Sequence, residues 1–528
     1  MDPQNISRSE PVPISRTVKT NLYKDSVALM RIAQTVLARD GVRRATLVMG
    51  TPANKDILAE AGLFDADLAN ARPGDVMIVV DAESDDAVQA AGAEIARLLE
   101  GEPPAPGSAQ AARVPLRSIA MAREGEGAPA TLAQISVPGP YAGAEAMKAL
   151  RQGLHVFLFS DNVPLEHERA IKMVARDKGL LVMGPDCGTA IIGGTPLGFA
   201  NVVKKGEISL VGASGTGLQE VTCQIDALGC GIRHAIGTGG RDVSADIGGI
   251  TMRQAIDLLA ADPGTRVIGI VSKPPAPEVA RQVLERAGRI GKPFVVLFLG
   301  DDLSTASLPN NVVAVATLYE AAAAAVRSVA GTRSPAAQEA EAWRRPVQDE
   351  AARLASGQRF VRGLYSGGTF CAEAQLVWRD LGFSVHSNAP LDKHAPAVAS
   401  GNAHTAIDLG ADEFTVGRPH PMIDPSTRID HIAAAARDPS TAAIVLDVVL
   451  GYGSHPDPAG ALAPAIAAAR AASAKEGRYL PVVSFVCGTE GDPQHLSAQQ
   501  ALLRSAGVLV LPGSTAAARA AGEIARRT

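Results

Sequence analysis

A glycine-rich turn between an apolar strand and a helix occurs twice in this chain. The first copy, Val-Gly-Ala-Ser-Gly-Thr-Gly at 211–217, follows the apolar run Ile208–Val211. The second copy, Leu-Tyr-Ser-Gly-Gly-Thr-Phe at 364–370, follows Phe360–Leu364. A helix-forming run comes next in both copies, and the small residues let the backbone turn tightly between strand and helix. The chain is therefore predicted to start two helices directly after two apolar strands.

Helix starts of this kind suit anions. They present free N–H groups and the positive end of the helix dipole, which attract phosphate and carboxylate groups. Two such starts predict one anion held between two helix N-termini. A third segment, Gly-Thr-Gly-Gly at 237–240, follows another strand and is expected to face the same ligand. The residues predicted to bind the anion are Ser214, Gly215, Thr216, Ser366, Gly367, Gly368, Thr369, Gly237, Gly239 and Gly240.

Length and composition exclude several classes of protein. A chain of 528 residues exceeds a single core, so several domains are expected. A net charge of −5 and 4% aromatic residues argue against a nucleic-acid partner. The five cysteines form no Cys-x-x-Cys pair, so no metal is predicted. Without a signal-like N-terminus or a long apolar run, a soluble, cytoplasmic protein with no membrane partner is expected.

Strands and helices alternate along most of the chain, which is typical of parallel α/β domains. Stretches rich in Gly, Pro and Ala predict linkers between them. The last two α/β domains repeat one plan, which indicates an internal duplication. The predicted organisation is an N-terminal α/β unit at 1–105, a linker at 106–130, a Rossmann-type unit at 131–200, an α/β domain at 201–330, a linker with a short helix at 331–358 and a second α/β domain at 359–528.

Several motifs resemble the succinyl-CoA synthetase superfamily, the ADP-forming acyl-CoA synthetases. Val-Pro-Gly-Pro-Tyr at 137–141 looks like that family's Val-Pro-Pro-Pro-Phe segment against CoA, and the segment 159–164 resembles its Thr-Glu-Gly-Ile-Pro. Gly-Pro-Asp-Cys-Gly at 184–188 resembles the Gly-Pro-Asn-Cys-Pro-Gly that ends the CoA-binding domain. The resemblance implies CoA, with a CoA-like segment made of Pro138, Gly139, Pro140, Tyr141, Asp161 and Asn162.

The resemblance continues to the end of the chain. Ser-Gly-Thr at 214–216 matches the α-subunit helix that cradles a phosphohistidine, and residues 359–528 look like the C-terminal domain of the β-subunit. This fused order is similar to the FdrA family of acyl-CoA synthetase-like proteins. It implies a multidomain α/β fold: a Rossmann-like CoA-binding-type domain and two flavodoxin-like succinyl-CoA synthetase domains, with a divergent α/β unit at the N-terminus.

The chain also departs from the synthetases. They relay phosphate through a histidine late in the first flavodoxin-like domain, where this chain has Asp-Asp-Leu-Ser-Thr-Ala at 301–306. His234 is the single histidine in 201–330 and precedes the glycine loop instead. No ATP-grasp domain comes before residue 359. ATP-driven ligation by this chain alone is therefore not expected.

Single residues at strand ends supply the remaining candidates. Weak catalytic candidates are Lys273, His455 and Asp408. Arg418 is a candidate for binding a substrate carboxylate, because Arg pairs with anions in a bidentate manner. His404 shares a strand face with Asp408 and is expected to pack. Cys187 lacks an identifiable base and is not expected to be a nucleophile.

Three functions are consistent with these residues. The first is a subunit that binds an acyl or carbamoyl phosphate and transfers the carbonyl group, since N–H donors can stabilise a leaving phosphate. FdrA-type proteins are associated with ureide nitrogen catabolism, so the resemblance implies oxamate carbamoyltransferase. The second is a succinyl-CoA ligase-type synthetase that needs a separate ATP-grasp subunit. The third is a non-catalytic scaffold that binds a metabolite. All three imply partner subunits and a homo- or hetero-oligomer.

Overall fold

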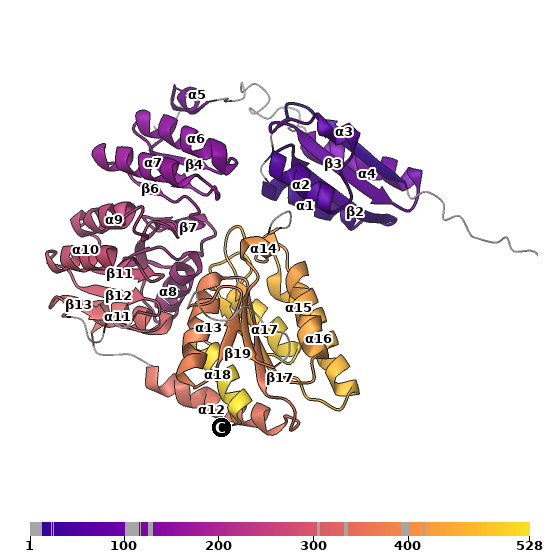
Figure 1. Ribbon diagram of the computed structural model, residues 1–528. Coiled ribbons are helices and arrows are strands. Elements are labelled where there is room, and N and C mark those ends of the chain that lie inside the picture. The colour runs from indigo at the N-terminus through magenta and orange to yellow at the C-terminus, as the bar shows by residue number, and fades with distance from the viewer. Residues whose placement is uncertain are drawn as a thin grey trace, which may run out of the picture. The chain divides into compact units, whose positions relative to one another are not determined.

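The structure is a computed structural model that divides into two compact units (Figure 1). The first unit comprises Met1–Arg117 and Thr415–Pro419, and the second comprises Ser118–Phe414 and His420–Thr528. The structure describes residues 13–22, 24, 26–100, 116, 118–124, 130–301, 303, 307–331, 336–391, 402–415 and 419–527. Within these ranges no helix is long and apolar enough to cross a membrane.

The first unit is a three-stranded sheet with helices on both faces. Its elements are β1 (Ile14–Lys19), α1 (Ser26–Leu37), β2 (Val42–Met49), α2 (Pro52–Glu60), α3 (Ala66–Ala69), β3 (Val76–Ala82) and α4 (Asp85–Glu100). The apolar side chains of α1 and α4 cover one face, and those of α2 and α3 cover the other. β3 lies between β1 and β2 and runs antiparallel to both. The expected parallel arrangement is therefore wrong here, because alternation of strands and helices does not fix strand direction.

The second unit begins with a small parallel domain. Its sheet has the order β4-β5-β6, and both pairings are parallel. Its elements are α5 (Ile119–Glu124), β4 (Leu132–Ile135), α6 (Gly139–Arg151), β5 (His155–Leu158), α7 (Leu165–Asp177) and β6 (Val182–Met183). The predicted linker at 106–130 lies mostly outside the described residues, and α5 falls in its described part.

The middle domain is a seven-stranded sheet of order β13-β12-β11-β9-β10-β7-β8. Strands β9 to β13 pair in parallel, and β7 and β8 add an antiparallel edge. Its elements are β7 (Thr189–Ile192), β8 (Thr195–Gly198), β9 (Lys205–Gly212), α8 (Gly215–Ala227), β10 (Ile232–Gly237), α9 (Ile250–Ala261), β11 (Val267–Ser272), α10 (Pro277–Gly288), β12 (Phe294–Phe298), β13 (Val312–Ala314) and α11 (Leu318–Ala330).

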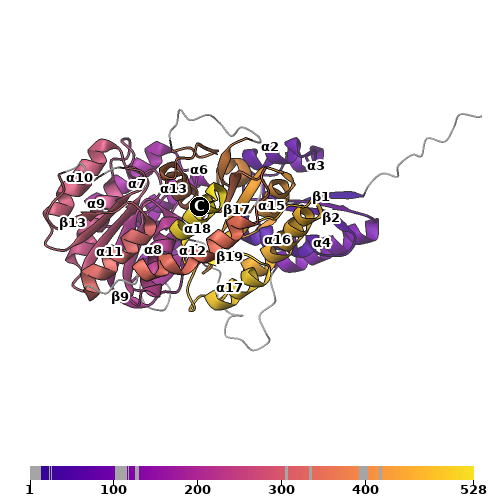
Figure 2. The same cartoon turned by 90° about the horizontal axis from the view of Figure 1, so that it is seen from below.

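The C-terminal domain is a fully parallel six-stranded sheet of order β15-β16-β14-β17-β18-β19, with helices on both faces (Figures 1 and 2). Its elements are β14 (Phe360–Tyr365), α13 (Gly368–Asp380), β15 (Val385–Ser387), β16 (His404–Asp408), α14 (Asp412–Thr415), α15 (Ser426–Arg437), β17 (Thr441–Val449), α16 (Pro458–Lys475), β18 (Val482–Cys487), α17 (Leu496–Ser505), β19 (Leu509–Leu511) and α18 (Ser514–Arg526). Helix α12 (Ala336–Ala352) precedes it and packs on α18, and it is longer than the short helix expected in this linker.

One hydrophobic core joins the middle and C-terminal domains. Leu218 and Val221 of α8 belong to the same buried cluster as Phe370 and Trp378 of α13. In each sheet the strand before these helices lies between two strands that follow it in the chain: β9 between β10 and β11, and β14 between β16 and β17. The chain therefore adds strands first on one side of β9 or β14 and then on the other side. Both helices therefore start at a topological switch point, where ligands bind in open parallel sheets.

Candidate active site

The two glycine-rich turns meet face to face. The hydroxyl oxygens of Ser214 and Thr369 lie 2.6 Å apart. On the other side of this contact, Thr216 packs on Gly367: a Cβ atom at position 367 would come within 2.7 Å of the Thr216 Cγ2. Each motif thus places its threonine against the turn of the other. The predicted pairing of the two helix starts is present in the structure.

Free N–H groups line this contact. Ser214 caps α8, and its Oγ accepts the N–H of Gly217 at 3.2 Å. The N–H groups of Gly215 and Thr216 in α8, and of Gly368 and Thr369 in α13, have no hydrogen-bond acceptor among the described residues. First-turn amides lack intrahelical acceptors by geometry. The positive ends of both helix dipoles therefore lie close together, an arrangement that favours an anion.

Ser366 is placed differently from the expectation. The residue that caps α13 is Gly367, and the Ser366 hydroxyl donates to Asp447. The Ser366 N–H also donates to Asp447, at 2.8 Å. Asp447 is fully buried and pairs with Arg428 at 3.0 Å. Ser366 thus anchors the second turn to a buried carboxylate, and its hydroxyl is not directed to an anion.

The third glycine segment packs on the turn at 184–188. Gly239 has a φ of +82°, and a Cβ there would lie 2.1 Å from the carbonyl oxygen of Pro185. A Cβ at Gly237 would meet the Cys187 Sγ at 2.5 Å. Only glycine permits this close approach. The two segments therefore form one rigid wall at the carboxyl end of β10.

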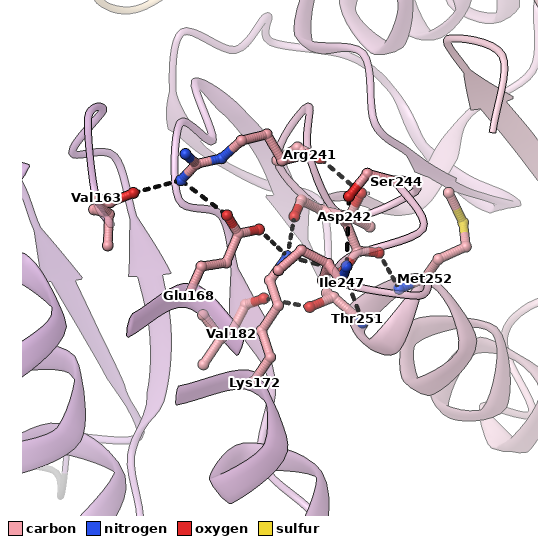
Figure 3. A network of polar contacts seen from close by, with 12 residues as sticks. Val163, Glu168, Lys172, Val182, Arg241, Asp242, Ser244, Ile247, Thr251 and Met252 are labelled. Carbon is pink, nitrogen blue, oxygen red and sulfur yellow. Dashed lines mark hydrogen bonds and ion pairs between the residues drawn. The ribbon is translucent and has the colours of Figure 1, made fainter. Parts of the chain in front are cut away.

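A buried ionic network supports the backbone of the glycine segment at 237–240 (Figure 3). The Lys172 ammonium lies 2.9 Å from Glu168 and 2.8 Å from Asp242, and it donates to the carbonyl oxygen of Thr238 at 3.1 Å. All three charged side chains are at most 1% exposed. Arg241 completes the network by pairing with Glu168 at 2.9 Å. Helix α7 of the small domain is thereby tied to the glycine loop of the middle domain.

Asp242 also fixes the next helix. Its two carboxylate oxygens accept the N–H groups of Thr251 and Met252, at 3.1 and 2.9 Å, at the start of α9 (Figure 3). The Thr251 hydroxyl in turn donates to the carbonyl oxygen of Val182 in the small domain at 3.0 Å. The loop between β10 and α9 is therefore held at both ends.

Asp408 lies beside the second turn, and Lys273 lies near the glycine segment at 237–240. The Lys273 Nζ would be 3.9 Å from a Cβ at Gly240, and its charge stabilises the carboxylate of Asp408. The Asp408 Oδ1 accepts the N–H of Gly410 at 3.0 Å, and Oδ2 would be 2.7 Å from a Cβ at Gly368. Burial raises the pKa of Asp408 to about 6, because lost hydration outweighs these favourable contacts.

His420 is a site residue that the sequence analysis did not select. A Cβ at Gly410 would lie 2.6 Å from its Nε2 and 2.7 Å from the carbonyl oxygen of Ser366. Its Nδ1 accepts the N–H of Met422 at 3.3 Å, so the neutral ring carries its proton on Nε2. Burial lowers the pKa of His420 to about 4. The candidate that the sequence supplied near His420 was Arg418, which lies outside the described residues.

The CoA-like segments contact each other. Gly139, the first residue of α6, packs on the carbonyl oxygens of Asp161 and Asn162, where a Cβ would lie within 2.4 Å of both. Tyr141, Asp161 and Asn162 are exposed at the carboxyl edge of the β4-β5-β6 sheet. Pro138 and Pro140 flank Gly139 and have no N–H. This edge therefore offers few donors for the phosphates of CoA.

The remaining candidates have structural contacts. His455 lies in the loop after β17, where its Nδ1 accepts the Asp457 N–H at 3.0 Å and its own N–H donates to Met422 at 2.8 Å. His404 stacks on Phe383 with a centroid distance of 3.9 Å, as expected for a packing residue. Cys187 is buried, and burial raises its pKa to about 12.

Three segments of the chain match known domain families. Residues 364–524 match a CoA-ligase domain, and residues 203–300 match a CoA-binding domain. Residues 12–115 match a domain described as the heavy metal-associated domain of AllF. Within the described residues, no group of three or more His, Cys, Asp or Glu side chains could hold a metal ion.

Relatives of known sequence cover the chain to different extents. YahF of Escherichia coli (strain K12) is 42% identical over 502 residues, which are 94% of this chain and 96% of that protein. The ADP-forming sulfoacetate-CoA ligase subunit SauD of Bilophila wadsworthia is 29% identical over 28% of this chain and 50% of its own length. The succinate–CoA ligase [ADP-forming] subunit alpha of Aquifex aeolicus is 29% identical over 26% of this chain and 46% of its own length.

Proposed function

The chain belongs to the family of YahF, within the succinyl-CoA synthetase superfamily and with an FdrA-like architecture, and we propose that it binds an acyl or carbamoyl phosphate between its paired helix starts. In this proposal the chain is a subunit that transfers the acyl or carbamoyl group, with oxamate as the carbamoyl acceptor in nitrogen catabolism. The 2.6 Å contact between Ser214 and Thr369, with free N–H groups on both sides, is the observation that carries it.

The proposed reaction has one bond formed and one broken at the carbonyl carbon. The acceptor attacks this carbon, and the bond from it to the phosphate oxygen breaks. The N–H groups of Gly215, Thr216, Gly368 and Thr369 then stabilise the negative charge that develops on the leaving phosphate. Lys273 adds a positive charge beside Gly240. The Lys172 network holds the glycine wall at 237–240 through the carbonyl oxygen of Thr238.

CoA enters the proposal through the family matches at 203–300 and 364–524. Pro138 and Pro140 have no N–H, the Tyr141 N–H donates to Pro138 at 2.9 Å, and Asp161 is acidic. The predicted CoA-like segment therefore fits the anionic phosphates of CoA poorly, and no step of the reaction is assigned to it.

A ligase that requires a separate ATP-grasp subunit is the second candidate, because the SauD and Aquifex relatives are ligase subunits. In this chain His234 could not serve as their phosphohistidine without moving. Its Nδ1 accepts the Gly193 N–H at 3.1 Å, and its Nε2 pairs with Asp262 at 3.4 Å. An acid-labile phosphoprotein formed from labelled ATP and a partner subunit would favour this ligase over the transferase.

A pair of glycine substitutions tests the proposed site. Gly367→Ala brings a Cβ onto Thr216 and separates the helix starts, whereas a Cβ at Gly357, outside the site, meets no atom within 4 Å. Gly357→Ala is therefore the matched control. We expect wild type and Gly357→Ala to release phosphate from carbamoyl phosphate when oxamate and partner subunits are present. Gly367→Ala should be slower by about 100-fold, the order found for loss of an oxyanion donor.

Two results would contradict the transferase. One is the absence of phosphate release from the wild type with every combination of substrate and partner. Binding of phosphate without any turnover would instead support a metabolite-binding scaffold. The other is equal activity of Gly367→Ala and Gly357→Ala, because the paired helix starts would then not be the reaction site.

A further inference from the structure

Asp186 occupies an unusual backbone conformation beside the candidate site. It lies in the turn at 184–188, and its φ of +54° places a non-glycine residue in the left-handed region. Its N–H donates to the carbonyl oxygen of Ser160 at 2.9 Å, while the buried Ser160 hydroxyl has no partner among the described residues. Strained residues of this kind persist where surrounding contacts enforce them, and they cluster at functional sites.

The turn fixes Asp186 relative to the paired helix starts. On one side Pro185 packs on Gly239, and on the other Thr189 packs on Gly215, the first residue of α8. The next residue, Cys187, is buried against Gly237. The Asp186 side chain, by contrast, is exposed to solvent. Among these residues Asp186 alone therefore presents an accessible ionisable group.

The charges that face Asp186 come from four different segments. They are Lys273 after β11, Asp161 after β5, Asp412 of α14 and Arg241 after β10. Although Asp186 is reached by solvent, the segments around it partly desolvate its carboxylate. This desolvation, aided by Asp161 and Asp412, raises the pKa of Asp186 to about 6 against the opposing charges of Lys273 and Arg241. A carboxylate with such a pKa exchanges protons readily near neutral pH.

Other carboxylates near the turns are engaged. Asp408 accepts the Gly410 N–H and lies over Gly368, and Asp447 is buried with Arg428. The Asp186 carboxylate has no hydrogen bond or ion pair within the described part of the chain. It is thus free to contact a substrate.

We propose that Asp186 is the general base of the transfer reaction, a role that rests on the proposed function. As the nitrogen of the acceptor adds to the carbonyl carbon, its proton passes to the Asp186 carboxylate. The bond between the carbonyl carbon and the phosphate oxygen breaks, and its electron pair leaves with the phosphate. Asp186 then returns the proton to water.

Asp186→Asn tests this role, because asparagine tolerates the left-handed conformation and keeps the side-chain size. Asp177→Asn, at the exposed end of α7, is the control for loss of one negative charge. We expect the turnover of Asp186→Asn to fall by about 100-fold or more, the usual range for a general base. The wild-type rate should increase as pH rises through about 6, and this increase should be absent from the variant.

A second measurement needs no turnover. Sulfate stays doubly charged between pH 5 and pH 8, so calorimetric titration with sulfate reports the charge of the protein site. The affinity of the wild type for sulfate should fall as Asp186 ionises. The fall should be smaller in Asp186→Asn, where the ionisation of Asp408 accounts for the dependence on pH that remains. If wild type and variant show the same dependence on pH, Asp186 does not face the anion and the inference is wrong. If neither protein binds sulfate, the anion site itself fails, and the proposed function fails with it.

Discussion

Glu373 of the C-terminal domain accepts the N–H of Leu318, the first residue of the last helix in the middle domain, at 2.9 Å. The reverse contact is also present: Glu220 of the middle domain accepts the N–H of Ser514, the first residue of α18, at 3.0 Å. Each glutamate is five residues after the first residue of its helix, α8 or α13. The two domains therefore cap each other's last helix with equivalent residues, as an internal duplication predicts.

Glu220→Gln should change the pH dependence of stability. Burial raises the pKa of Glu220 to about 7 from 4.5. Between these pH values the folded protein holds a proton that the unfolded chain has lost, so stability falls as pH rises. Glutamine keeps the acceptor for Ser514 and carries no charge. The variant should therefore unfold at a higher denaturant concentration than wild type at pH 8, and the gain should shrink at pH 5. An equal gain at both pH values would argue against the shift, and Glu145→Gln, at a half-exposed position, is the control.

Lys172→Met should strongly destabilise the second unit. The substitution leaves the buried carboxylate of Asp242 without its cation and Glu168 with Arg241 alone. Breaking a buried pair in this way typically costs about 3–5 kcal/mol of unfolding free energy. Lys148→Met removes the exposed pair with Glu145 and should cost less than about 1 kcal/mol. Urea denaturation measures both. Similar values for the two variants would mean that the buried network does not hold α7 to the glycine loop.

Ser214→Ala and Thr369→Val should interact in a double-mutant cycle. Loss of the Ser214 cap is expected to cost about 1 kcal/mol of unfolding free energy. Because the two hydroxyl groups share one hydrogen bond, the double variant should lose less than the sum of the single variants, by about 0.5 kcal/mol or more. Strict additivity in chemical denaturation would show that the two turns do not contact each other in solution.

Cys187 should resist alkylation in the folded protein. Burial raises its pKa to about 12, so almost no thiolate forms at pH 8. Cys230 is partly exposed and serves as the internal reference. Mass spectrometry after brief iodoacetamide treatment should find label on Cys230 and none on Cys187. Early labelling of Cys187 would place it at an accessible surface and reopen a nucleophilic role.

The strands, helix starts and turns that form the site were predictable from sequence because their signals are local. An apolar run followed by Ser-Gly-Thr determines both the strand end and the helix cap, as at Ser214. Packing of His404 followed from strand periodicity alone. The fold class and the superfamily followed from several such motifs in the right order.

What sequence did not reveal depends on contacts between distant residues. β1 and β2 both run antiparallel to β3, the strand that lies between them, and this direction depends on how the three strands pair in the folded unit. Ser366 was predicted to bind the anion, but Asp447, 81 residues later, accepts its hydroxyl and its N–H. Lys172 and Asp242 are 70 residues apart and carry no local pattern. The nearness of His420 to Gly410 likewise requires the folded chain.

The mutual capping by Glu220 and Glu373 bears on how the second unit folds. Neither domain satisfies the first N–H of its last helix by itself, and one apolar core spans both. The middle and C-terminal domains should therefore unfold in a single transition and behave as one cooperative unit. If the chain were cut between α11 and α12, the two fragments should recover their structure on mixing, at a rate set by their concentration.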